Sequence, residues 1–120
     1  MELDRRGVLA LGGAAVAAAP ALGALPAGRG SAVLIFDPAS VEARALAAPA
    51  KGYRLVALTG DPVRLWRDGL AEHRGPVAGL TRWSDYLVLR GLAEEGGLRL
   101  RSEERVATGR GPLLVRWQMG

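Results

Sequence analysis

The sequence predicts a small three-layer α/β domain of order βαβαβαββ, with a mostly parallel sheet of Rossmann-like or flavodoxin-like wind. Short apolar runs of strand length alternate with segments of helical periodicity, and the links between them are short and rich in Gly and Pro. Such alternation favours parallel strands joined by right-handed helical crossovers. The last strand is expected to be antiparallel and to lie at the edge. A two-layer α/β sandwich is the alternative architecture.

The expected boundaries come from caps and turn residues. Ser40, Asp61 and Thr81 can each cap a helix, and Pro62 suits the first helical position after Asp61. The expected strands are 32–36, 53–58, 76–80, 98–101 and 113–117, and the expected helices are 40–48, 61–75 and 81–95. The apolar positions of the two longer helices are expected to be Val63, Trp66 and Leu70 in the second, and Trp83, Tyr86, Leu87, Leu89 and Leu92 in the third.

Composition excludes several cofactor chemistries. The 120 residues include no cysteine and one histidine, His73, so disulfides, thiolate zinc sites, iron–sulfur clusters and covalently attached c-type haem are ruled out. We therefore expect no metal or cofactor held by this chain alone. The formal net charge is +4, but the charges are scattered without a block of one sign, and no nucleic-acid partner is expected.

The N-terminus carries an export pattern. Arg5 and Arg6 precede an uncharged stretch at 7–28, with a small-residue exit at 24–27. This resembles the twin-arginine class of signal peptides, which the twin-arginine translocase reads as an address. The resemblance implies a signal helix at 1–27, transport of an already folded domain at 28–120, and a periplasmic location. A general secretory signal and a retained anchor, which would give membrane contact through the signal alone, are the alternatives.

The carboxyl ends of the expected parallel strands form the candidate site, because ligands of open α/β sheets bind at that rim. Asp37 and Asp61 could hold a cation or act as acid and base. The start of the third helix favours an anion, and an indole there offers a stacking face. The competing interpretation is that these residues only cap helices or fill the core. The rim residues are Asp37, Thr59, Gly60, Asp61, Thr81, Arg82, Trp83 and Ser84.

Familiar catalytic motifs are missing. The chain has no G-x-G-x-x-G or Walker loop to cradle phosphates and no G-x-S-x-G nucleophile elbow. Asp37 lacks the second aspartate of a D-x-D motif, and His73 is expected near the end of its helix, away from the rim. No catalytic residue is therefore assigned.

Three segments of the expected domain resemble a group of small exported proteins. The segments DPVRLW at 61–66, VAGLT at 77–81 and RGLAEEGG at 90–97 are similar to small twin-arginine-exported proteins of GC-rich proteobacteria. The resemblance implies no particular activity. It implies that the helix carrying Trp66 and a turn at 79–81 are the group's signature.

Three functions fit these observations. The first is an exported accessory or escort protein that docks to a cofactor-bearing or redox partner, through an exposed apolar patch expected at 113–115 and Trp117. The second is a periplasmic module that binds a small molecule at the rim. The third is a small hydrolase that uses the rim aspartates.

Overall fold

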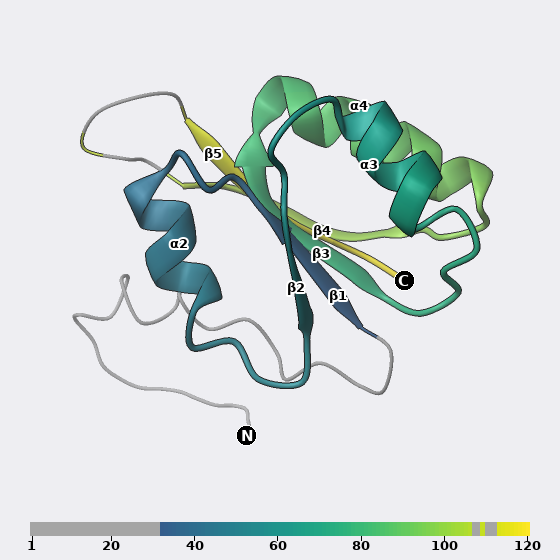
Figure 1. Ribbon diagram of the computed structural model, residues 1–120, viewed down its shortest axis with the longest axis horizontal. Helices are drawn as coiled ribbons and strands as arrows, with labels where there is room; N and C mark the ends of the chain where they lie inside the picture. The colour runs from purple at the N-terminus through teal and green to yellow at the C-terminus, as the bar shows by residue number, and fades with distance from the viewer. Residues whose placement is uncertain (1–31, 107–108, 110–112) are drawn as a thin grey trace.

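The computed structural model describes residues 32–106, 109 and 113–120, and within them the chain forms an α/β fold of five strands and three helices (Figure 1). The predicted signal at 1–27, including Arg5 and Arg6, lies outside these residues. No helix in the described ranges is long and apolar enough to cross a membrane. The elements are β1 (Val33–Phe36), α2 (Val41–Ala47), β2 (Arg54–Ala57), α3 (Pro62–Gly69), β3 (Val77–Arg82), α4 (Trp83–Glu95), β4 (Leu100–Val106) and β5 (Leu114–Met119).

The sheet is mixed, so the predicted mostly parallel, Rossmann-like wind is wrong. Its strand order is β2-β1-β3-β5-β4. The pairings of β1 with β2 and with β3 are parallel, whereas β5 pairs antiparallel with both β3 and β4. After α4 the chain forms β4, which runs parallel to β3 and is separated from it by one strand position. The last strand then returns through the space between them.

The expectation that the last strand lies at the edge is also wrong. β5 is interior, with Leu114, Val115, Trp117 and Met119 all buried. β4 is the edge, and its sequence LRSEERV is almost entirely exposed. Apolar side chains on both faces of β5 require cover on both sides. A charged strand, by contrast, suits an edge because its charges oppose pairing with other chains.

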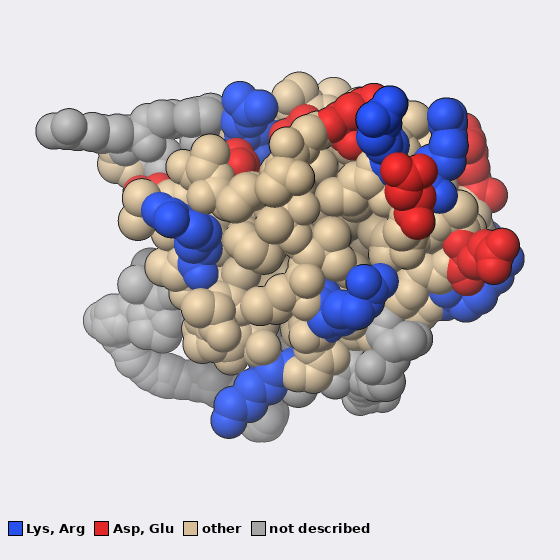
Figure 2. All heavy atoms as spheres, in the orientation of Figure 1, with Lys and Arg blue, Asp and Glu red and all other residues tan. Residues whose placement is uncertain are grey.

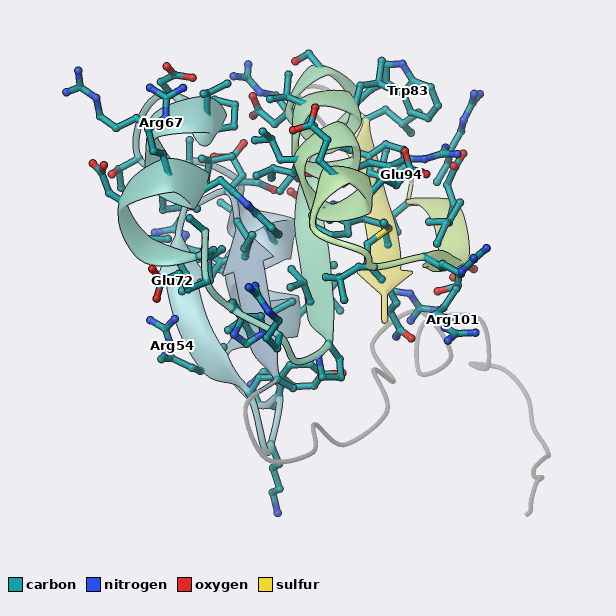
Figure 3. The ribbon with its side chains drawn as sticks, turned by 90° about the vertical axis from the view of Figure 1, so that its right-hand side faces the viewer. Arg54, Arg67, Glu72, Trp83, Glu94 and Arg101 are labelled. Carbon is teal, nitrogen blue, oxygen red and sulfur yellow. The ribbon has the colours of Figure 1, made fainter. Side chains whose placement is uncertain are left out.

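Helices cover both faces of the sheet, which also excludes the two-layer alternative (Figure 1). On one face α2 packs over β1 and β3 through Ala43 and Ala47. On the other face α3 and α4 lie side by side (Figure 3) and bury a larger cluster that includes Trp66, Tyr86 and Trp117. Only two positions in α4 differ from the expected apolar set, since Trp83 and Leu87 are exposed.

Gly79 lies beneath the Trp117 indole at the centre of the sheet. The two residues are directly opposite in the β3–β5 pairing. A Cβ atom at position 79 would come within 2.0 Å of the indole Cε2 atom, so only glycine leaves room for the ring. The segment 79–81 is therefore the buried middle of a strand, and the predicted turn there is wrong.

Candidate functional site

The carboxyl ends of β1, β2 and β3 meet at one rim, where the structure has an open groove of about 410 Å³. The groove lies beside the central strand of three parallel neighbours, where ligands of α/β sheets commonly bind. Its lining residues are Asp37, Pro38, Ala39, Leu58, Thr59, Gly60, Arg82 and Asp85.

Asp37 follows the last residue of β1 and is held in place by its own loop. The Ala39 N–H donates to Asp37 Oδ1 at 2.9 Å. The other carboxylate oxygen lies 3.8 Å from Arg82 Nε, and only 14% of the Asp37 side chain is exposed. This carboxylate is therefore fixed in orientation at the groove, with one oxygen directed toward the Arg82 guanidinium.

Arg82 stands between two carboxylates. It is the last residue of β3 and the N-cap position of α4, and Asp85 follows three residues later in the first turn. Arg82 Nε is 3.8 Å from Asp85 Oδ2 as well as from Asp37, and 52% of the Arg82 side chain is exposed. At 3.8 Å these are ion pairs without hydrogen bonds, so the guanidinium keeps donors for a further acceptor.

Burial raises the pKa of Asp85; Arg82 opposes that shift and the negative charge of Asp37 adds to it. Only 17% of this side chain is exposed. A carboxylate in a groove with a raised pKa is a usual sign of a binding or catalytic position. Asp85 was not among the predicted site residues, because an acid three residues after Arg82 on a helix indicates an ion pair but not burial in the groove.

Asp61 is a helix cap, as its position before Pro62 predicted. Its Oδ1 accepts a hydrogen bond of 3.0 Å from the Val63 N–H at the start of α3, and the residue is exposed. It does not line the groove, whereas its neighbours Thr59 and Gly60 do. The two aspartates expected to act together, Asp37 and Asp61, thus have separate tasks.

Thr81 is buried in the core, and its predicted role as a helix cap is wrong. β3 continues one residue past it, and α4 has no side-chain cap. Thr81 Oγ1 accepts a hydrogen bond of 3.0 Å from Trp117 Nε1, and both residues have no exposed surface. This bond satisfies an indole N–H that would otherwise be buried without a partner.

Thr81→Val is expected to destabilise the protein by about 1–3 kcal/mol, because the isosteric valine leaves the buried Trp117 N–H without an acceptor. Urea unfolding measures the change. Thr59→Val, at an exposed threonine of the groove, is the matched control and is expected to stay within about 0.5 kcal/mol of the native protein. Equal effects of the two changes would show that the buried bond contributes nothing.

The remaining predicted rim residues lie outside the groove. Trp83, labelled in Figure 3, is at the first position of α4. Its ring lies 5.4 Å from that of Tyr86, and the Arg105 guanidinium lies 5.1 Å above it. This stacking occupies one face of the indole. Ser84 is exposed and is not among the lining residues. His73 lies beyond the end of α3, with Nε2 3.3 Å from the Pro76 carbonyl oxygen.

A second polar cluster fastens α4 to the edge strand. The Tyr86 hydroxyl donates to Glu103 of β4, and Arg90 donates to the Tyr86 oxygen at 3.3 Å and to Glu94 at 3.3 Å. Burial and the bond to Glu103 raise the pKa of Tyr86, while Arg90 opposes the shift. Each polar group has a partner within the cluster, so its role is structural.

No metal-binding group of three or more His, Cys, Asp or Glu side chains comes together among the described residues. Comparison of the chain with protein-family models, with curated proteins and with solved structures finds no match. What the fold and groove define is an α/β protein with a mixed sheet and a charged groove at the carboxyl ends of its parallel strands. The groove presents one guanidinium, that of Arg82, and two carboxylates, those of Asp37 and Asp85.

Proposed function

We propose that the protein is a binding module for a small polar molecule that carries both charges, such as a free amino acid. The observation that supports this is the half-exposed Arg82, held between Asp37 and Asp85 above an open groove. An anionic group of the ligand would take the free guanidinium donors. A cationic group would then pair with the carboxylate of Asp85, whose ion-pair partner Arg82 would be drawn toward the ligand.

Titration of the full chain with each of the common free amino acids, followed by amide chemical shifts, tests this proposal. We expect shifts at Thr59, Gly60 and Asp85. Arg82→Gln is expected to weaken binding by about 10- to 100-fold, the loss of one charge-assisted hydrogen bond. Arg64→Gln is the matched control, since Arg64 is exposed on α3 and outside the groove. Binding by none of these probes would contradict the proposed ligand class.

An exported accessory or escort protein is the second candidate, and the exposed apolar residues of α4 favour it. Trp83, Leu87 and Val88 are 37%, 47% and 38% exposed. Most of the docking patch expected at 113–115 and Trp117 is buried, namely Leu114, Val115 and Trp117, although Leu113 is exposed. We therefore expect a cofactor-bearing partner to dock on α4, where three exposed apolar residues lie close together in the sequence. The native mass of the protein isolated from its own host tests this proposal. A particle larger than this chain alone that contains a cofactor supports an escort, provided that the Leu87→Glu variant does not form it.

Either function would operate in the periplasm if the twin-arginine resemblance holds. Arg5→Lys together with Arg6→Lys is then expected to stop export, because the translocase reads the arginine pair itself rather than its charge. Fractionation should find the variant protein in the cytoplasm, folded and uncleaved. Glu2→Gln, at an acidic position outside the arginine pair, is the control. Normal export of the double variant would exclude the twin-arginine route.

A further inference from the structure

The charges in the groove at the carboxyl ends of β1, β2 and β3 do not balance. Arg82 is the one basic residue among the described lining residues, whereas Asp37 and Asp85 both line the groove. Both carboxylates depend on this guanidinium, since neither has another ion pair within the described ranges of the chain. At neutral pH the groove therefore carries one more negative charge than positive.

Burial makes this imbalance unfavourable. The side chains of Asp37 and Asp85 are mostly buried, and a carboxylate that is withdrawn from water needs a cation beside it. Burial and the negative charge of Asp37 raise the pKa of Asp85, although Arg82 opposes the shift. On the face shown in Figure 2 the acidic side chains lie beside basic ones, so that face has no wide acidic area. The shortage of positive charge is a local property of the groove.

A neutral zwitterion would not correct this shortage. When its carboxylate binds Arg82, three carboxylates share one guanidinium, those of Asp37, Asp85 and the ligand. A single ammonium group on the ligand leaves one negative charge in excess. A second cationic group on the same ligand would give each carboxylate a positive partner.

We propose that the ligand is a basic amino acid such as lysine, whose carboxylate binds Arg82, whose α-ammonium group pairs with Asp85 and whose side-chain cation pairs with Asp37. This inference rests on the proposed function and narrows its ligand class. The Asp37 carboxylate has an oxygen for the second cation, because the Ala39 N–H donates to Oδ1 alone. Its other oxygen, Oδ2, is 3.8 Å from Arg82 Nε, a separation too long for a hydrogen bond.

The size and the apolar lining of the groove also suit a basic amino acid. Its volume of about 410 Å³ is near the lower end of the range for small-molecule sites, roughly 300–1,000 Å³. Pro38, Ala39 and Leu58 line it as well, and their apolar surfaces can contact the methylene groups that join the two cationic ends of the ligand. An acidic side chain in the same place would add to the excess negative charge.

Calorimetric titration of the full chain with lysine, norleucine and glutamate at neutral pH tests this inference. Norleucine has the carbon chain of lysine without the terminal ammonium group, so the two ligands differ only in the second cation. We expect lysine to bind about 10- to 100-fold more tightly than norleucine, and glutamate to bind most weakly. Equal affinities for lysine and norleucine would overturn the inference and leave the proposed function in place. Binding by none of the three would overturn both.

Asp37→Asn tests the role assigned to that carboxylate. Asparagine keeps an oxygen that can accept from the Ala39 N–H, and it leaves one carboxylate and one guanidinium in the groove. The variant should therefore bind norleucine at least as tightly as lysine. Asp68→Asn removes the same charge from an exposed position of α3 outside the groove and should keep the native preference for lysine. Circular dichroism establishes that both variants are folded. Retention of the lysine preference in Asp37→Asn, or its loss in Asp68→Asn, would show that the inference is wrong.

Discussion

Gly79→Ala is expected to destabilise the protein by about 3 kcal/mol or more, among the largest effects of any single methyl group in this chain. The added Cβ atom would lie 2.0 Å from Cε2 and 2.1 Å from Cζ2 of Trp117, in a fully buried layer. The indole cannot move aside without breaking its hydrogen bond to Thr81 or its packing on Tyr86. Thermal unfolding should show a melting temperature lower by about 10 °C or more.

A matched glycine and a second-site change test the cause. Gly91 lies inside α4, and a Cβ atom there meets nothing within 4 Å. Gly91→Ala should therefore stabilise the protein by about 0.5–1 kcal/mol through helix propensity. If the steric explanation is right, Gly79→Ala costs much less in a Trp117→Leu background than in the native one. Equal costs in both backgrounds would show that the indole is not the obstacle.

The local chemistry of the chain was readable from the sequence. Ser40 and Asp61 cap α2 and α3 as predicted, because a short polar side chain before a helical run accepts the free N–H groups of the first turn. Trp66 and Leu70 are buried as their spacing indicated. The α/β class is confirmed, since it depends only on this alternation of local elements.

The strand order could not be predicted from the sequence in the same way, because it depends on which strands are covered on both faces. The composition of the last two strands indicated which of them is interior and which is at the edge. Val115, Trp117 and Met119 are buried on one face of β5 and Leu114 on the other, whereas β4 carries arginine and glutamate. An apolar strand after a charged one favours insertion of the later strand into the sheet, which the local pattern of turns does not reveal.

The groove was predicted in part. The rim and four of its lining residues, Asp37, Thr59, Gly60 and Arg82, were named from the rule that ligands bind at carboxyl ends of strands. Thr81 was misassigned because β3 runs two residues past the expected end, which turns a cap position into the core. Asp85 was missed because its significance comes from burial beside Arg82 and Asp37, which one-dimensional spacing does not contain.

Asp85 is expected to make stability and ligand binding respond to pH with opposite signs. Its pKa is raised above the ordinary value of 3.8, so on acidification the folded state takes up a proton before the unfolded state does. The contribution of Asp85 to stability therefore improves as the pH falls from neutral toward 4. Pairing with a cationic group requires the ionised carboxylate, so affinity for the proposed ligand falls over the same range.

Asp85→Asn separates the two responses. At pH 7 the variant should be at least as stable as the native protein, because no carboxylate is desolvated beside Asp37, and this advantage should shrink on acidification. Its affinity for an amino acid ligand should be lower by about tenfold or more and should no longer change between pH 7 and 4.

Asp68→Asn, at an exposed carboxylate of α3, is the matched control for both measurements. Urea unfolding and calorimetric titration across this range measure them, and a variant that keeps the native pH dependence of binding would remove Asp85 from the site. Because the two responses have opposite signs, a general loosening of the fold could not produce both.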